Sequence, residues 1–319
     1  MSAGSDVFYN PLNAFFSYTL DPLQVPTDFG IDNFDDNLHD VWYQLRHPRK
    51  AIEAEGGVTQ FINREILPID PDNIQDSVAA LPNYSLHLLG GGLAFRKDLE
   101  WFRAHDYPMP KLVAVAWSMA AELIQEAVER KTTIDTDPIA DFYLFRPLGI
   151  ILFSQDRFAR FIHRTLNPAI WPMMHGWDVR DDRFLNTGIS YVYRPPALTV
   201  ANRQGFIYTG LTTLFGLSHP TAAGGSLSWG IGAAVEQIVR QRDIKVELKP
   251  SLGLFHDRNN SLLWSVLLND AGNNRLRVNV YPRSGNRFSR AGWFFSVDDR
   301  GKVAAGVSLN FPLGLGVSR

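Results

Sequence analysis

Several residue types and motifs that would identify common protein classes are missing from this sequence. The 319 residues include no cysteine, so disulfide frameworks, thiolate zinc sites and cysteine nucleophiles are excluded. Basic and acidic residues are nearly balanced, 31 against 33, which predicts no nucleic-acid or polyanion partner. There is also no GxSxG elbow, P-loop, HExxH motif or dinucleotide-binding GxGxxG. The sequence therefore names no reaction, and we expect no bound cofactor.

Two kinds of membrane-targeting segment are also missing. No window reaches about 18 uncharged apolar residues, the length that a transmembrane helix needs. The best candidate, residues 139–153, is interrupted by Asp141, Arg146 and Pro147. The first ten residues have neither the basic start nor the apolar core of a signal peptide. If the protein crosses a membrane, we expect this chain to have been trimmed, or its start to be assigned too far downstream.

The first half of the chain has the pattern of helices joined by loops rich in Pro, Asp and Asn. Asp137-Pro138 has the composition of a helix start, because Asp can cap and Pro suits the first helical position. Residues 166–182 contain two prolines, a glycine and a charged stretch, which is typical of a linker. The sequence predicts helices near residues 40–66, 86–104, 110–131 and 137–165.

After about residue 184 the hydrophobic period changes to two. Val303, Val307 and Leu309, for example, alternate with Ala304, Gly306 and Ser308. Successive side chains of a strand point to opposite faces, so each segment has one apolar face and one polar or small face. Turn-forming residues separate eight such segments: 184–193, 205–216, 225–239, 243–256, 260–269, 274–282, 290–298 and 302–312.

Alternating segments of about ten residues are typical of outer-membrane β-barrels, although a soluble β-sandwich or a lipocalin-like barrel alternates too. Three features favour the membrane interpretation. The charged residues of the strands fall on the face opposite the aliphatics, namely Glu236, Lys245, Glu247, Lys249 and Arg277. Small residues share that face, as a narrow lumen requires: Gly230, Gly232, Ala234, Gly306 and Ser308. Aromatic residues gather at segment ends, where interfacial girdles are expected: Tyr191, Tyr193, Tyr208, Trp264, Trp293 and Phe311.

The densest set of ionisable groups lies in the helical half. Gly90 and Gly91 follow His87 by three and four residues and share its helix face, so a second helix could approach the imidazole closely. Glu122, Glu126 and Glu129 are spaced i, i+4, i+7 and form one acidic stripe on the next helix. Asp135, Asp137 and Asp141 follow.

One histidine with two or three carboxylates could bind a hard metal ion or act as an acid/base pair. His87, Glu122 and Glu126 are therefore the candidate catalytic residues, and the sequence does not decide whether they hold a metal. The competing interpretation is structural: a carboxylate stripe on a helix is commonly a solvated face, and a histidine beside glycines is commonly a packing residue.

An ordered set of short motifs in the helical half resembles that of uncharacterised bacterial envelope families catalogued as domains of unknown function. The set comprises Asn83-x3-His87-x2-Gly90-Gly91, Trp101-Phe102-Arg103-x-His105, Glu122-x3-Glu126-x2-Glu129 and Asp137-Pro138-x2-Asp141 with Pro147 and Gly149. In those families such helices precede a predicted outer-membrane barrel. This chain differs from their pattern at Phe145-Arg146, where a small polar residue is expected. The resemblance implies an envelope location and no established activity.

Together these patterns predict an α+β protein of two domains. Residues 1–182 form a helical, periplasm-facing domain, and residues 183–319 form an eight-stranded antiparallel β-barrel in a bacterial outer membrane. We expect membrane lipid and an envelope protein as partners. The leading hypothesis for function is an envelope scaffold or a lipid- or partner-binding protein. The alternative is a hydrolase or another enzyme that modifies lipid or cell-wall material with the His/Glu site.

Overall fold

The structure is a computed structural model, and it describes residues 5–25, 29–67, 83–130, 136–222, 224–240, 244–282, 291–308 and 314–318. The chain divides into two compact units. One, the sheet unit, contains the residues up to Val25 together with Arg160–Gln237 and Glu247–Arg319. The other, the helical unit, contains Pro26–Ala159 and Ile238–Val246.

The helical unit is built from short helices in chain order. Its α-helices are α3 (Phe34–Arg46), α4 (Pro48–Glu55), α5 (Val58–Phe61), α7 (Gly91–Ala104), α8 (Pro110–Glu129), α9 (Asp137–Ala140) and α10 (Arg146–Phe153). Among the described residues of this unit, three segments are π-helical: η2 (Ile62–Ile66), η3 (Asn83–Gly90) and η4 (Asp141–Phe145). Beyond α10, α11 (Asp156–Leu166) begins in this unit and ends in the sheet unit. Among the helices that the structure describes, none has the length and apolar character needed to cross a membrane.

The helices predicted over residues 86–104 and 110–131 correspond to η3 with α7 and to α8, which ends at Glu129. The helix expected over residues 137–165 is interrupted at Ser154 and Gln155. Pro147 lies just after the π-helical segment η4, and the helical backbone continues from η4 into α10 without a break.

Glycines allow α7 and α10 to pack closely. A Cβ on Gly149 would lie 2.6 Å from the carbonyl oxygen of Leu88, and one on Gly92 would lie 2.3 Å from the Phe153 ring. The glycines inside this helical pattern therefore have a packing role.

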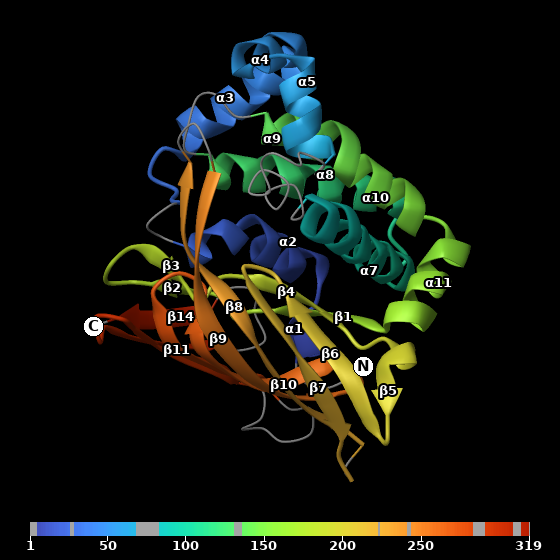
Figure 1. The fold of residues 1–319 in the computed structure, drawn as a ribbon, viewed down its shortest axis with the longest axis vertical. Helices are drawn as coiled ribbons and strands as arrows, with labels where there is room; N and C mark the ends of the chain where they lie inside the picture. The colour runs from blue at the N-terminus through green and yellow to red at the C-terminus, as the bar shows by residue number, and fades with distance from the viewer. Residues whose placement is uncertain are drawn as a thin grey trace. The chain divides into compact units, whose positions relative to one another are not determined.

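The described residues contain fourteen strands in one sheet (Figure 1), and all of them lie in the sheet unit except for the residues of β8 and β9 within Ile238–Val246. They are β1 (Pro168–Pro172), β2 (Gly176–Asp178), β3 (Arg183–Leu185), β4 (Ile189–Tyr193), β5 (Thr199–Val200), β6 (Arg203–Thr209), β7 (Thr212–Pro220), β8 (Ser226–Arg240), β9 (Ile244–Arg258), β10 (Ser261–Asp270), β11 (Asn274–Val280), β12 (Gly292–Asp298), β13 (Val303–Ser308) and β14 (Gly314–Ser318). The hydrogen-bonded order is β1-β4-β6-β7-β8-β9-β10-β11-β12-β13-β14-β2-β3, with β5 paired to β6.

This topology contradicts the predicted eight-stranded antiparallel barrel. The ladder is an open path from β1 to β3, and β14 pairs with β2 in parallel. The predicted segment 205–216 is two strands, β6 and β7, because the chain turns at Gly210. The residues expected to be a linker contain β1 and β2. Pro168 and Pro172 fit in β1 because they lie at its two ends, on the terminal strand of the ladder, where a missing N–H is tolerated.

The sheet curls, so that strands far apart in the ladder order contact one another across its inner face. Tyr281, which follows β11, donates a 2.5 Å hydrogen bond to the carbonyl of Pro172 in β1. Trp171 of β1 donates from its indole nitrogen to the carbonyl of Asn260, in the turn between β9 and β10, at 2.8 Å. Around these contacts lies a buried cluster that includes Val192, Phe206, Phe255 and Phe294 among others.

The first residues of the chain also pack against the inner side of this sheet. They form α1 (Ser5–Phe8), α2 (Pro11–Thr19) and η1 (Asp21–Gln24). The Ser5 hydroxyl accepts a 2.7 Å bond from the backbone N–H of Leu262, and Asp21 Oδ1 accepts one of 2.7 Å from the N–H of Ile189. Residues 5–25 therefore help to fill the interior of the sheet unit.

Candidate functional site

The structure brings the three predicted site residues together inside the helical unit. His87, Glu122, Glu126 and Asp141 each offer one potential ligand atom, and these four atoms all lie within 4.8 Å of one another. Glu122 is 0% exposed and Glu126 is 4% exposed, so their part of the acidic stripe is not a solvated face. His87 and Asp141 are buried as well. We call these four residues the buried tetrad.

Short contacts connect the members of the buried tetrad. His87 Nδ1 lies 2.8 Å from Glu122 Oε1 and 3.4 Å from Asp141 Oδ2. Glu122 Oε2 accepts a 2.5 Å hydrogen bond from Arg146 Nε, and the terminal Nη2 of Arg146 forms an ion pair with the same oxygen. Glu122 thus holds a histidine with one oxygen and an arginine with the other.

The local fold explains how these side chains meet. His87 lies in the π-helical segment η3 and Asp141 in the π-helical segment η4, whereas Glu122 and Glu126 occupy successive turns of α8. Single π-helical turns are rare and occur frequently at functional sites, because they re-aim side chains relative to a regular helix. Asn83, which begins the predicted N-x3-H motif, has no described side chain, and Asp135 lies outside the described residues.

Arg146 is the member of this site that the sequence analysis missed. Its guanidinium lies against Gly91: a Cβ at that position would be 2.0 Å from Arg146 Nη1. The sequence contained a signal, because Gly91 was expected to admit a close neighbour and Arg146 was where the chain departed from the family pattern. The predicted neighbour was the glutamate helix, and the group that occupies the space over Gly91 is the arginine of α10.

Burial and neighbouring charges change the protonation of the site. Burial alone would lower the pKa of His87, but the charge and hydrogen bond of Glu122 outweigh it and raise the pKa above its usual value. Burial raises the pKa of Asp141 well above the usual range, and the nearby charges of Asp137 and Glu126 raise it further. Burial likewise raises the pKa of Asp98 on α7, with Arg146 offsetting part of the effect. The site therefore contains more buried carboxyl groups than cationic groups.

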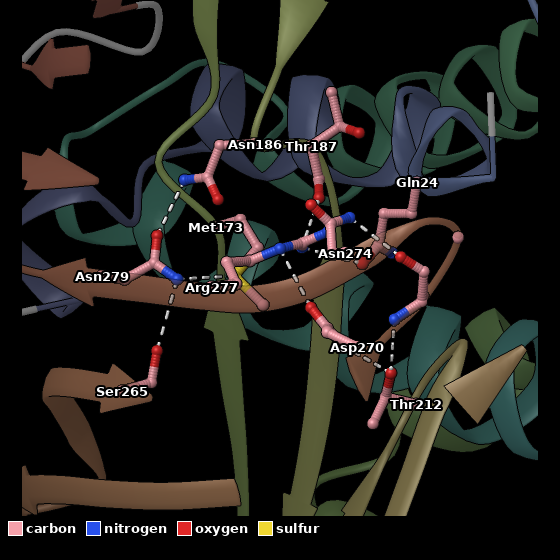
Figure 2. Close-up of polar contacts among 12 residues, drawn as sticks. Gln24, Met173, Asn186, Thr187, Thr212, Ser265, Asp270, Asn274, Arg277 and Asn279 are labelled. Carbon is pink, nitrogen blue, oxygen red and sulfur yellow. Dashed lines mark hydrogen bonds and ion pairs between the residues drawn. The ribbon is translucent and has the colours of Figure 1, made fainter. Parts of the chain in front are cut away.

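The inner face of the sheet unit holds a second polar network, centred on Arg277 of β11 (Figure 2). Arg277 Nε lies 2.9 Å from Asp270 Oδ2, and Thr212 donates a 2.5 Å hydrogen bond to the other oxygen of Asp270. Arg277 Nη1 also donates to the side chain of Gln24 at 3.2 Å and to the carbonyl of Thr187 at 3.3 Å. Because these partners come from strands, a loop and η1, the network fixes the curl of the sheet and the position of η1.

Two further polar groups occupy the same inner face. Asn279 accepts a 2.7 Å hydrogen bond from Asn186 and donates one of 3.3 Å to Ser265, as Figure 2 shows. Arg194 pairs with Asp257 through contacts of 2.5 and 3.1 Å, and both side chains are at most 3% exposed. The predicted enclosure of charge is therefore seen at Arg277. Glu247, by contrast, is exposed, and the side chain of Lys245 lies outside the description.

The outer face of the sheet is apolar and exposed. The outward positions of β11, β12, β13 and β14 are all apolar: Leu276, Val278, Val280, Trp293, Phe295, Val297, Val303, Ala305, Val307, Leu315 and Val317. On β7, β8, β9 and β10 the exposed apolar side chains are Phe215, Leu227, Trp229, Ile231, Val246, Leu248, Leu252, Leu254 and Leu268. A groove of about 820 Å³ lies over β11–β14, with Trp293, Val307 and Leu315 among its walls.

The expected aromatic girdle is mostly wrong. Tyr208 is buried on the inner face beside Val192, whereas Tyr191 and Tyr193 are buried on the opposite face of β4, each at 9% exposure or less. Trp293 does point outward, and Phe311 lies outside the described residues.

Comparison with known proteins does not assign a function to this site. No protein-family model, curated protein or solved structure matches the chain. The resemblance of the helical motifs to envelope families stays a prediction.

Proposed function

We propose that this protein is a membrane-embedded scaffold, whose sheet unit sits in the lipid of a bacterial outer membrane and whose helical unit carries the buried tetrad. The observation that supports it is an inversion of the usual burial pattern. In a water-soluble sheet with one exposed face, the exposed positions are polar and the buried ones apolar. Here the outward positions of four consecutive strands are all apolar, while Arg277, Asp270, Arg194 and Asp257 are buried.

Cross-strand pairing makes this outer face continuous. Val280 of β11 lies opposite Trp293, Trp293 lies opposite Val307, and Val307 lies opposite Leu315. Exposed apolar surfaces larger than a few hundred Å² are rare on soluble monomers and mark contacts with membranes or proteins. Lipid acyl chains are the partner that such a face fits best, because the chains are apolar and require no complementary shape on the protein. Spanning sheets are found in bacterial outer membranes, which is why we place the protein there.

Backbone hydrogen bonding is the main requirement for placing a sheet in lipid. The ladder ends at β1 and β3, and one stretch of chain, residues 168–178, pairs with β4 through β1 and with β14 through β2. Between them the N–H of Met173 donates to Gly188 and the carbonyl of His175 accepts from Gly314, at 2.9 and 2.8 Å. This stretch is therefore hydrogen-bonded to β4 on one side and to β14 on the other, while β1 and β3 are the edge strands of the ladder among the described residues.

Quenching of tryptophan fluorescence by brominated lipids tests this proposal. Trp293 on the sheet is 44% exposed and Trp42 in the helical unit is 49% exposed, so they form a matched pair. The full chain is reconstituted into vesicles whose phospholipid acyl chains carry bromine, which quenches only rings in contact with them. We expect Trp293→Phe to remove a measurable part of the quenching and Trp42→Phe to remove none. Equal effects of the two substitutions, or no quenching in the wild type, would refute the lipid-facing sheet.

A charge substitution provides an independent check. Ile231 of β8 is 57% exposed and Leu112 of α8 is 59% exposed. Lysine on the lipid face of a spanning sheet costs about 2–4 kcal/mol near the bilayer centre. Ile231→Lys should therefore lower the stability of the vesicle-bound protein by that amount, whereas Leu112→Lys should change it by less than about 0.5 kcal/mol. Urea unfolding from vesicles, followed by fluorescence, measures both.

A further inference from the structure

The buried tetrad contains a set of donor groups that suits a metal ion. One imidazole and three carboxylates point to a common centre, and the four ligand atoms lie within 4.8 Å of one another. The four side chains come from η3, α8 and η4, so the site is assembled by the fold and not by one acidic stretch. All four residues are at most 7% exposed. Buried carboxylates are costly unless a cation or hydrogen-bond donors compensate them.

Asp141 is the member of the buried tetrad whose negative charge no described hydrogen-bond donor compensates. Its side chain is 0% exposed, and neither of its oxygens accepts a hydrogen bond from the residues that the structure describes. The nearest cationic group is the His87 ring, whose Nδ1 is 3.4 Å from Oδ2 and closer still to Glu122. Arg146 does not compensate Asp141, because its guanidinium is engaged with Glu122. A fully buried carboxylate that faces three other donor groups is an observation that points to a missing cation.

The distances fit the edges of a coordination polyhedron. Zinc and similar ions bind nitrogen and oxygen at about 2.0–2.2 Å, so adjacent ligand atoms lie about 3.0 Å apart in an octahedron and about 3.4 Å apart in a tetrahedron. The separations of His87 Nδ1 from Glu122 and Asp141 are 2.8 and 3.4 Å. The widest separation in the tetrad is at most 4.8 Å, so it needs to contract by no more than about 0.6 Å to reach the distance of about 4.2 Å that separates opposite ligands.

We propose that the buried tetrad binds one first-row divalent cation through His87, Glu122, Glu126 and Asp141. The donor set favours Zn²⁺, Mn²⁺ or Fe²⁺, because an imidazole suits these ions, whereas Mg²⁺ and Ca²⁺ prefer oxygen ligands alone and soft ions prefer sulfur. Arg146 acts from outside the coordination sphere: it holds one oxygen of Glu122 and leaves the other facing His87. This site is independent of whether the sheet unit lies in lipid.

Metal uptake by the purified full chain tests the proposal, with ZnCl₂ and MnCl₂ as probes after removal of bound metal by a chelator. We expect one equivalent per chain by elemental analysis and calorimetry. Asp141→Asn and Glu126→Gln keep the size of each side chain, and each should weaken binding by about 100-fold or more. Asp98→Asn is the matched control, because Asp98 is a carboxylate of the same unit that is also buried but is not in the ligand set.

A second measurement separates loss of the site from loss of the fold. The probe metal should raise the midpoint of thermal unfolding of the wild type and of Asp98→Asn, and leave that of a folded Asp141→Asn unchanged. If Asp141→Asn does not fold, the wild type alone decides through the absorption spectrum of bound Co²⁺, which reports coordination by nitrogen and oxygen. A wild-type chain that takes up less than one equivalent, or a folded Asp141→Asn that binds as well as the wild type, would overturn the proposal.

Discussion

Replacing Gly149 by alanine tests how closely η3 and α10 pack. Two opposing effects decide the result. Alanine is favoured over glycine inside a helix by about 1 kcal/mol, so an unhindered site would be stabilised. At Gly149, however, the new Cβ would lie 2.6 Å from the carbonyl oxygen of Leu88, which is 0.8 Å short of an ordinary contact at 3.4 Å.

The steric effect should prevail at this position. The obstructing atom belongs to the backbone, which cannot rotate away as a side chain can, so the overpacking cost should reach the upper part of the usual range, about 3 kcal/mol. Subtracting the gain in helix propensity leaves a net destabilisation of about 2 kcal/mol. For a unit of this size, this lowers the unfolding temperature by roughly 4–8 °C.

Thermal unfolding followed by circular dichroism at the helical band measures this change. Gly30→Ala serves as the control, because a Cβ on Gly30 would meet no atom within 4 Å, and its midpoint should stay within about 1–2 °C of the wild type. A Gly149→Ala protein that unfolds at the wild-type temperature or above it would show that the helix propensity gain is realised in full. The close approach of Gly149 to the carbonyl of Leu88 would then be wrong.

Two further predictions concern buried charges. Because burial raises the pKa of Asp98, this carboxyl stabilises the fold most at low pH, and the contribution is lost as the pH rises through its raised pKa. Asp98→Asn should therefore unfold at a higher temperature than the wild type at about pH 8 and close to it at about pH 3, below the ordinary pKa of an aspartate. The exposed Asp106→Asn is the control, and a difference independent of pH would contradict this. Arg277→Met leaves Asp270 buried without its cation and should cost about 3–5 kcal/mol in detergent-solubilised protein unfolded by urea. Lys302→Met, which removes a half-exposed pair with Asp181, should cost less than about 1 kcal/mol, and equal costs would rule out a buried role for Arg277.

The strands of the sheet could be predicted to a large extent, because period-two alternation is a local property of the sequence. Val303, Val307 and their inward neighbours Ala304 and Gly306 alternate as expected. Pairing of distant segments is not local, which is why the open ladder and the parallel pair of β14 with β2 were not predicted. The strand Gly314–Ser318 also alternates, but five residues are too few to identify a strand by period alone.

The candidate site was predicted in part for the same reason. His87, Glu122 and Glu126 could be selected because their spacing places them on single helix faces. Burial of the glutamates could not be read from the stripe, since an acidic helix face is more commonly solvated. Arg146 adjoins a proline at the start of α10, and no periodicity links it to the glutamate that it holds 24 residues earlier. The contact arises only when two helices pack at Gly91.

The single stretch that contains both β1 and β2 constrains the order in which the protein can assemble. β2 is made early, but its partner β14 lies about 140 residues later in the chain. Until β14 has been synthesised, one side of β2 presents free backbone donors and acceptors, which are prone to pair with other chains. Contacts of such long range also form slowly. A nascent chain of this kind would benefit from a factor that shields the early strands until the last one arrives.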